Sequence, residues 1–369
     1  MNVVVTGGGT AGHVFPALAT ATALRDRHGA SIVFVGAEDG QEARLVPEAG
    51  FRFVPVHVSA AQARSSVATL RAVILALRGA RSVRGLIRGS DVVVSIGGFA
   101  SGPAALAARR TRRPLVLIEP NSVPGIVNRI AARWATAVAT TFDGTATRLP
   151  HDTRVERTGN PIRTEIAAVP QRRARLRVEA CEAFGLEPDR TTVFVFGGSQ
   201  GALHLDQMVA EALPVLATRG DLQLLVSAGP GQDADVARAV DPSAAVRVAV
   251  VPFIDRMDRA FALADLVVAR AGGSVAEVTA CGLPSILVPY PHATENHQEA
   301  NARELVAAGA SRMMLDRDLS SSTLAAAILD LVDDGEARAA MGAAALAWAR
   351  PDAAARIADL CAEVAGARR

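Results

Sequence analysis

The sequence contains no lysine, because all 39 basic residues among its 369 are arginines. A chain without lysine cannot form a Schiff base with a pyridoxal cofactor or a carbonyl substrate. It also has no P-loop lysine and no lysine of the kind that contacts ATP in protein kinases. The abundance of alanine and arginine points to GC-rich codon usage, and these chemistries are excluded whatever the cause.

The sequence also has few aromatic residues, a net charge close to zero and no closely spaced cysteines. Only 4% of the residues are aromatic and the net charge is +2, so we expect no binding to nucleic acid. The three cysteines, Cys181, Cys281 and Cys361, are too far apart for a CxxC metal site or a disulfide framework.

No apolar run reaches about 18 residues, which predicts no membrane span. The opening MNVVV is expected to be a first strand, not a secretory signal, and a cytoplasmic protein is favoured.

Short β-branched runs alternate with alanine-rich stretches along almost the whole chain. Apolar runs of this length are typical of parallel strands buried on both faces, with helices as the crossovers. We therefore predict an α/β fold of two doubly wound, Rossmann-like domains. The predicted strands include residues 3–6, 31–35, 92–95, 115–118, 193–196, 223–227, 247–251, 266–269 and 285–288.

The boundary between the two domains is predicted near residues 160–165. A turn cluster, TGNP at 158–161, precedes a charged segment expected to be helical up to residue 186. We assign residues 1–162 to the first domain and 163–349 to the second, sizes that suit two separate cores. The tail, at about 350–369, is expected to form a helix that packs back on the first domain.

Two glycine-rich segments follow predicted strands in the first domain. The first glycine loop, GGGTAGH at 7–13, places Gly7, Gly9 and Gly12 in the pattern G-x-G-x-x-G. The second glycine loop, IGGFASGP at 96–103, repeats the arrangement. Such loops let backbone amides at a helix N-terminus bind a diphosphate, and tight turns without a ligand are the alternative.

His13 lies in the first turn of the helix that follows the first glycine loop. The positive end of the helix dipole favours neutral imidazole there, which makes His13 a candidate general base. A capping or packing histidine is the alternative.

Two further glycine-rich segments occupy corresponding places in the second domain. The third glycine loop, FGGSQGA at 196–202, adds the polar side chains of Ser199 and Gln200. In the fourth, RAGGSVAE at 270–277, Glu277 lies one helical turn inside, where a carboxylate can accept hydrogen bonds from two ribose hydroxyls. Four such loops predict a cleft between the domains that holds two phosphate-bearing ligands.

These segments occur in an order that resembles the MurG family of peptidoglycan glycosyltransferases over nearly the full chain. The shared motifs are GGGTAGHVFPALA, IGGFASGPAALAA, IEPNSVPGIVNR, TGNPIR, FGGSQGA, PFIDRM, the loop from AGG to Glu277, and HATENHQEANA. The resemblance implies the GT-B architecture, with the acceptor in the first domain and the nucleotide sugar mainly in the second. It implies transfer of N-acetylglucosamine from UDP-N-acetylglucosamine to the C4 hydroxyl of undecaprenyl-diphosphate-N-acetylmuramyl-pentapeptide, with inversion.

The resemblance also assigns roles to individual residues. Thr10, Ala11 and Gly12 would line the sugar end of the donor, with His13 near the attacking hydroxyl. The remaining donor contacts would be Asn121 and Gln298 to the sugar, Arg163 and Ser199 to the diphosphate, Ile254 to the uracil and Glu277 to the ribose. Gly98, Ser101 and Asn128 would face the acceptor.

Three departures from the family pattern stand out. Ala11 replaces the usual glycine of the first loop, and Ile118 and Pro120 replace histidine and glutamine beside Asn121. The loop 271–277 is one residue shorter than the pattern. These changes bear on donor binding, because they alter or remove groups near the expected sugar and phosphate positions.

The segment between Glu48 and Asp91 has no acidic residue but contains seven arginines interleaved with apolar residues. An apolar stripe flanked by arginines suits the surface of an anionic membrane, and an ordinary amphipathic helix packed on its own sheet is the alternative. A second basic cluster comprises Arg109, Arg110, Arg112 and Arg113. The resemblance places the protein on the cytoplasmic face of the bacterial membrane, in contact with other cell-wall synthesis proteins.

No cofactor is expected, and no metal is expected to take part in the chemistry, since no Asp-x-Asp motif follows a strand. Three other functions remain open from the residues alone. A nicotinamide oxidoreductase would use the first glycine loop, but only Glu38 lies near the position of its ribose-binding acid. A nucleotide-sugar epimerase and a non-catalytic UDP-sugar-binding protein are the others.

Overall fold

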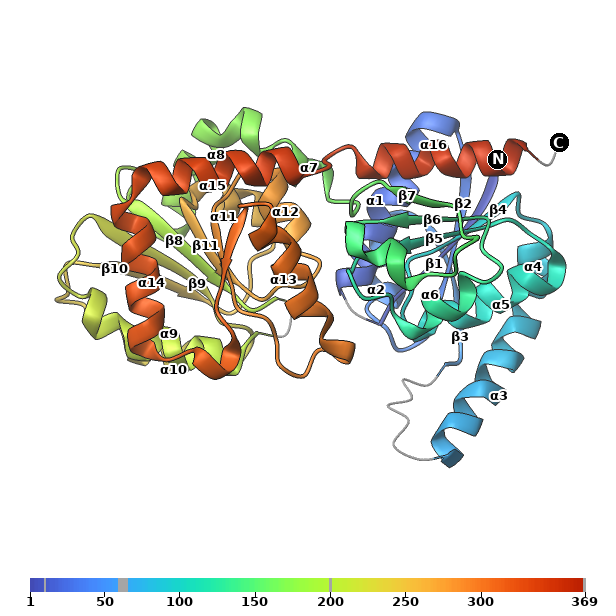
Figure 1. Ribbon diagram of the computed structural model, residues 1–369, viewed down its shortest axis with the longest axis horizontal. Coiled ribbons are helices and arrows are strands. Elements are labelled where there is room, and N and C mark those ends of the chain that lie inside the picture. The colour runs from blue at the N-terminus through green and yellow to red at the C-terminus, as the bar shows by residue number, and fades with distance from the viewer. Residues whose placement is uncertain (10, 59–65, 199–200, 368–369) are drawn as a thin grey trace. The chain divides into compact units, whose positions relative to one another are not determined.

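The computed structural model describes residues 1–9, 11–58, 66–198 and 201–367, without the side chains of residues 11 and 66–72. The contacts divide the chain into two units (Figure 1). The first unit is Met1–Arg163 together with Arg350–Arg369, and the second is Thr164–Ala349.

The first unit contains a seven-stranded parallel sheet in the order β3-β2-β1-β4-β5-β6-β7. Its strands are β1 (Asn2–Thr6), β2 (Ser31–Ala37), β3 (Arg52–Val56), β4 (Val92–Ser95), β5 (Leu115–Glu119), β6 (Ala137–Thr140) and β7 (Val155–Arg157). Its helices are α1 (Ala11–His28), α2 (Glu42–Glu48), α3 (Ser66–Ser82), α4 (Arg84–Arg88), α5 (Gly102–Thr111), α6 (Ile126–Ala131) and α16 (Ala353–Gly366), with the 3-10 helices η1 (Phe99–Ser101) and η2 (Asp143–Arg148).

Helices cover both faces of this sheet, since successive strand residues point to opposite sides. On β1, Val3 and Val5 pack against α1 and α16, while Val4 belongs to the core under α3, α4 and α5. The carboxyl-terminal helix α16 packs directly along α1 (Figure 1).

The second unit contains a six-stranded parallel sheet in the order β10-β9-β8-β11-β12-β13. Its strands are β8 (Thr191–Phe196), β9 (Leu222–Ser227), β10 (Arg247–Val251), β11 (Leu266–Ala269), β12 (Ser285–Leu287) and β13 (Ser311–Met313). Its helices are α7 (Thr164–Ala167), α8 (Val169–Phe184), α9 (Leu203–Leu216), α10 (Asp233–Arg238), α11 (Met257–Leu263), α12 (Val275–Ala280), α13 (His297–Ala307), α14 (Ser321–Asp333) and α15 (Gly335–Trp348), with the 3-10 helices η3 (Thr294–Asn296) and η4 (Asp316–Asp318).

The core of the second unit again lies on both faces of its sheet. Val193 and Val195 of β8 pack with α9 and α14, whereas Phe194 and Phe196 pack with α8 and α11. The rings of Phe194 and Phe196 are stacked with centroids 4.8 Å apart, and Phe261 lies edge-on to both. The predicted α/β fold with two parallel sheets is confirmed.

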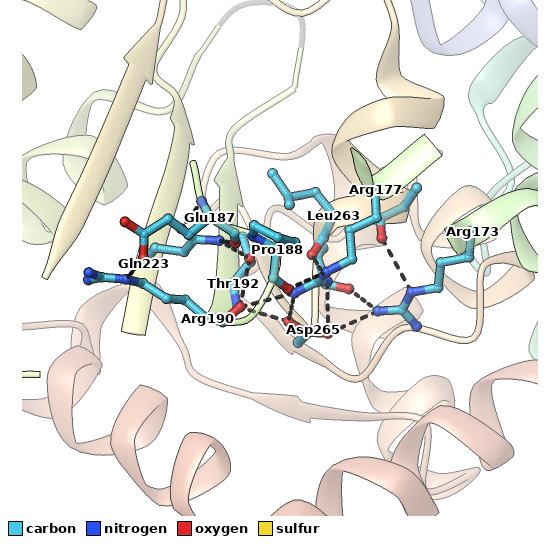
Figure 2. Close-up of polar contacts among 11 residues, drawn as sticks. Arg173, Arg177, Glu187, Pro188, Arg190, Thr192, Gln223, Leu263 and Asp265 are labelled. Carbon is cyan, nitrogen blue, oxygen red and sulfur yellow. Dashed lines mark hydrogen bonds and ion pairs between the residues drawn. The ribbon is translucent and has the colours of Figure 1, made fainter. Parts of the chain in front are cut away.

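The amino-terminal edge of the second sheet is held by a network of arginines around Asp265 (Figure 2). One Asp265 oxygen accepts hydrogen bonds from the Thr192 amide at 2.9 Å and from Arg177 at 3.0 Å, and the other accepts from Arg173 at 3.1 Å. The two arginines also donate to carbonyl oxygens at the end of α11. These contacts join α8 and α11 to the start of β8.

Within residues 1–9, 11–58, 66–198 and 201–367, no helix is both long enough and apolar enough to cross a membrane.

The three cysteines, Cys181, Cys281 and Cys361, are buried thiols that form no disulfide, as their spacing in the sequence predicted.

Candidate functional site

Each sheet has a topological switch point, and two glycine loops flank it. In the first unit the chain winds outward from β1 through β2 to β3, then returns to β4 on the other side of β1. The first and second glycine loops follow β1 and β4, which are neighbours. The third and fourth follow β8 and β11, which are also neighbours. In open α/β sheets, ligands bind in the crevice at the carboxyl ends of the strands at such a point.

The two glycine loops of the first unit touch each other. A Cβ atom at Gly98 would lie 2.8 Å from the carbonyl oxygen of Gly8, and one at Gly7 would lie 3.0 Å from the Ile96 side chain. Gly98 also has a φ of 75°, a conformation that L side chains rarely adopt. The two loops therefore depend on glycine for their close approach.

His13 lies at this contact. It is the third residue of α1 and half-buried, and its Cε1 atom lies 3.8 Å from the position of a Cβ atom at Gly98. Ser101, predicted to face the acceptor, is buried, and its hydroxyl donates to the Gly98 carbonyl oxygen at 2.8 Å. The structure thus brings together His13, Gly98 and Ser101, which the sequence singled out separately.

Asn128 borders the same loop from α6. It is 2% exposed, and its Nδ2 atom donates to the Ile118 carbonyl oxygen at 2.9 Å. A Cβ atom at Gly97 would lie 2.9 Å from this Nδ2, so Asn128 packs directly on the second glycine loop.

Glu119, which no sequence motif marks, is the centre of a polar network in this unit. Its Oε2 accepts hydrogen bonds from Asn128 Nδ2 at 2.9 Å and from the Gly125 amide at 3.0 Å. Its Oε1 accepts from the Asn121 amide at 3.0 Å and from Asn121 Nδ2 at 3.3 Å. One buried carboxylate therefore positions both asparagines that the family pattern assigns to substrate.

Burial raises the pKa of Glu119 from 4.5 to about 7, although the hydrogen bonds from Asn128, Gly125 and Asn121 lower it. The folded protein therefore binds a proton more tightly than the unfolded chain. The resulting stabilisation is fully present below pH 4.5 and is lost as the pH rises through 7.

This shift predicts a pH-dependent difference between the protein and its Glu119→Gln variant. Between pH 4.5 and 8, we expect the wild-type free energy of unfolding to fall by about 3 kcal/mol more than that of the variant, which has no titrating group at this position. Urea unfolding across this range measures it, with the exposed Glu182→Gln as control. Parallel pH dependences for wild type and Glu119→Gln would rule the shift out.

Arg163 belongs to the first unit by its contacts. Its guanidinium lies 4.8 Å from the centroid of the Phe15 ring on α1, a cation–π contact. Arg163 and His13 therefore lie in the same unit, although the sequence predicted that the second domain begins at Arg163.

In the second unit, α13 holds the fourth glycine loop. Asn301 Nδ2, fully buried, donates to the Ala271 carbonyl oxygen at 3.0 Å. Gln298 accepts from the Tyr290 amide at 2.9 Å, and its Nε2 lies 3.7 Å from the position of a Cβ atom at Gly272. Gln298, which the family pattern assigns to the donor sugar, thus lies beside the fourth glycine loop.

The other predicted donor residues are placed as follows. Glu277 is half-buried on α12, and Ile254 is a buried core residue after β10. Gly12 is exposed in the first turn of α1. Thr10, Ser199 and the side chain of Ala11 lie outside the described residues.

A charged cluster that the sequence analysis did not predict lies beneath the third and fourth loops. Arg270, 7% exposed, pairs with Asp316, whose second carboxylate oxygen lies 2.9 Å from His204 Nδ1. Asp206 accepts from the Ala202 amide at 3.1 Å, and burial raises its pKa to about 6. The cluster ties α9 to the end of β11.

The arginine-lined cavity at the opposite edge of this sheet is not a second candidate. It measures about 570 Å³ and includes Arg173, Arg177 and Arg338 in its lining. The donors of these arginines already reach carbonyl oxygens at the ends of α11 and α14, and Asp265. These arginines therefore stabilise the carboxyl-terminal ends of α11 and α14, and their role in this cavity is structural.

Comparison with known proteins identifies the family. The family 28 glycosyltransferase N-terminal domain matches residues 3–140, and the family 28 C-terminal domain matches residues 192–357. The UDP-N-acetylglucosamine--N-acetylmuramyl-(pentapeptide) pyrophosphoryl-undecaprenol N-acetylglucosamine transferase of Acidothermus cellulolyticus is 42% identical over 100% of this chain and 99% of its own. The chain belongs to this family of N-acetylglucosamine transferases. It is a glycosyltransferase, as the resemblance implied.

Other similar proteins agree with this family. The transferase of the same name from Halothermothrix orenii is 38% identical, with 91% of each chain covered. The crystal structure of Acinetobacter baumannii MurG superposes with a TM-score of 0.78 at 27% identity, covering 98% of this chain and 99% of that one. The Neisseria meningitidis UDP-GlcNAc 2-epimerase, at 13% identity and a TM-score of 0.69, covering 98% of this chain and 100% of its own, shares the fold alone. The epimerase and the non-catalytic binding protein are not favoured.

Proposed function

We propose that the protein transfers N-acetylglucosamine from UDP-N-acetylglucosamine to the C4 hydroxyl of undecaprenyl-diphosphate-N-acetylmuramyl-pentapeptide, the step from lipid I to lipid II in peptidoglycan synthesis. The proposal rests mainly on the family and on the paired glycine loops at both switch points. The first unit, with His13, Gly98, Ser101 and Asn128, takes the acceptor. The second unit takes the nucleotide sugar.

The reaction we propose is a single displacement. The acceptor C4 oxygen forms a bond to the anomeric carbon as the bond from that carbon to the UDP oxygen breaks, so the configuration inverts. His13 accepts the hydroxyl proton, and the electron pair of the broken bond leaves with UDP. Arg163 and the helix N-termini after the glycine loops of the second unit stabilise the negative charge on the departing diphosphate.

On the donor side, Glu277 accepts hydrogen bonds from the ribose hydroxyls and the Ile254 backbone contacts the uracil. Asn121 and Gln298 contact the N-acetylglucosamine, with Thr10, Ala11 and Gly12 at its edge. Ser199 holds the diphosphate together with Arg163. The reaction uses no metal ion in this scheme, and its rate is expected to be unchanged by EDTA.

The acceptor is a membrane lipid, and we propose that α3, α4 and α5 face an anionic membrane surface on the cytoplasmic side. Val73 and Ile74 of α3 are 49% and 40% exposed, whereas Val83 and Ile87 are buried in the core. The helical segment therefore packs on its own unit through α4 and the end of α3. The exposed Val73 and Ile74 lie nearer the amino-terminal end of α3, the end that projects from this unit in Figure 1.

The basic residues on this face support the membrane proposal. Within the described part of the chain, Arg78, Arg81, Arg84 and Arg110 make no ion pair with an acidic residue. Arg81, Arg84 and Arg110 also line a cavity of about 320 Å³ with Ala80 and Ala107. Positive side chains without acidic partners beside exposed apolar residues suit lipid headgroups.

Replacing Arg78, Arg81 and Arg84 together with serine is expected to weaken binding to vesicles containing anionic phospholipid by about 100-fold. Each arginine near the headgroups contributes about 1 kcal/mol. Co-sedimentation with vesicles measures the affinity, and the exposed Arg172→Ser in the second unit is the matched control. Equal binding by the triple variant and the control would place the membrane contact elsewhere.

Turnover assays test the proposed function itself. Purified protein with UDP-N-acetylglucosamine is expected to release UDP only when the lipid-linked muramyl-pentapeptide is added. Release of UDP at the same rate without acceptor, or epimerised sugar nucleotide as the product, would contradict it.

A further inference from the structure

Glu42 is a buried carboxylate directly beneath the first glycine loop. It is the first residue of α2 and only 1% exposed. Its Oε2 accepts a hydrogen bond from the Gly9 amide at 2.9 Å, and its Oε1 accepts one from the Ala37 amide at 2.8 Å. The carboxylate thus joins the loop after β1 to the end of β2.

Three glycines form the walls around this carboxylate. A Cβ atom at Gly8 or Gly40 would overlap the carboxylate group, and one at Gly36 would lie 2.6 Å from the Glu42 Cγ. These glycines come from the first loop, the end of β2 and the turn before α2. Any larger residue at these three positions would displace the Glu42 side chain. The three glycines therefore leave a space that is just large enough for this carboxylate.

The hydrogen bond from Gly9 has a consequence for substrate binding. A glycine loop that binds phosphate presents its backbone amides to the ligand. Here the Gly9 amide is directed to an internal anion, and a buried negative charge beneath the loop repels a second anion at the same place. The contact between Gly8 and Gly98 links this loop to the second one. At the second loop, the Asn128 amide lies against Gly97 and donates to the Glu119 carboxylate at 2.9 Å, so this carboxylate reaches the loop only through a side-chain amide.

We propose that Glu42 is a positioning residue for glycosyl transfer. It acts as an internal anion that fixes the first glycine loop, so that this loop carries His13 against Gly98 and does not bind a substrate phosphate. The acceptor diphosphate is then bound at the second loop. This inference rests on the proposed function and adds to it which loop holds the acceptor anion.

Glu42→Gln tests the proposal with little change in side-chain volume. The amide keeps one acceptor but turns an N–H donor towards a backbone N–H, so the contact with either the Gly9 amide or the Ala37 amide is lost. We expect kcat to fall by about 10–100-fold, because small displacements of catalytic groups have effects of this size. The KM values for donor and acceptor are expected to stay within about threefold. Glu48→Gln, on the same helix but exposed, is the matched control.

Hydrogen exchange provides a second readout that does not depend on turnover. In Glu42→Gln the amide of Gly9 or of Ala37 is expected to exchange faster, while the exchange of residues in β4 stays unchanged. Gly40→Ala displaces the carboxylate without removing its charge, and the same fall in kcat is expected. Thermal unfolding of both variants identifies any that fail to fold, and the proposal is judged on folded protein.

The possible outcomes separate this inference from the proposed function. Unchanged kcat with a lower KM for the lipid acceptor would show that the first loop binds the diphosphate, and would overturn the proposal. Unchanged exchange of both the Gly9 and the Ala37 amides in folded Glu42→Gln would also overturn it. If wild-type protein transfers no sugar at all, the proposed function fails, whereas the exchange of Gly9 and Ala37 still decides whether Glu42 fixes the loop.

Discussion

Replacing His13 with alanine is expected to lower kcat for N-acetylglucosamine transfer by about 10²–10⁴-fold, the usual contribution of a general base. The imidazole lies at the contact between the two glycine loops of the first unit, next to Gly98. At this position it can accept the proton of an acceptor hydroxyl. The KM for UDP-N-acetylglucosamine is expected to change by less than a few fold, because the donor binds mainly to the second unit in our proposal.

Steady-state kinetics with varied donor and acceptor separate kcat from KM for this variant. His151→Ala, which changes an exposed residue in a turn of the same unit, is the control and is expected to keep wild-type kcat. A His13→Ala enzyme with wild-type kcat would remove His13 as the base. A raised donor KM with unchanged kcat would assign it to donor binding instead.

Asp265→Ala is expected to lower the free energy of unfolding by about 2–4 kcal/mol. The carboxylate, 27% exposed, accepts hydrogen bonds from the Thr192 amide, Arg173 and Arg177 (Figure 2). Its removal leaves the guanidinium groups without their negative partner and exposes an unpaired amide at the start of β8. Urea unfolding monitored by circular dichroism measures the loss.

The control for Asp265 is an exposed ion pair in the same unit. Asp221 pairs with Arg219 at 2.7 Å but is 61% exposed, so Asp221→Ala is expected to cost less than about 1 kcal/mol. Equal effects of Asp221→Ala and Asp265→Ala would show that the network of Figure 2 contributes no more than a surface pair.

The central strands of both sheets could be predicted from the sequence because they are short, continuous apolar runs. β3, β7 and β13 were not predicted. They lie at or near sheet edges, are partly exposed, and contain residues such as Pro55, Glu156 and Arg312 that interrupt the apolar pattern. β6 was not predicted either, although it is fully buried, because its sequence AVAT resembles the alanine-rich helices of this chain.

The candidate site could be predicted only in part. The glycine loops are visible in sequence because each follows a strand, and the sheet order then brings them together in pairs. Glu42 and Glu119 were missed because nothing in their neighbours marks a buried carboxylate. Each carboxylate accepts hydrogen bonds from backbone amides, and glycines or asparagines surround it. These groups come close to it only in the folded chain.

The fourth glycine loop shows the same limit. The resemblance predicts one residue fewer than in the family pattern, but only the structure shows that Asn301 and Gln298 of α13 support this loop. Gly272 lies against Gln298, so the loop remains beside the residue assigned to the donor sugar.

The structure of the product tests the central claim most directly. Turnover of UDP-N-acetylglucosamine with the lipid-linked muramyl-pentapeptide, followed by mass spectrometry and NMR of the lipid product, gives the number and linkage of the sugars added. We predict one N-acetylglucosamine in β-linkage to O4 of the muramyl residue. An α-linkage, a different attachment site, or unmodified lipid would contradict the account.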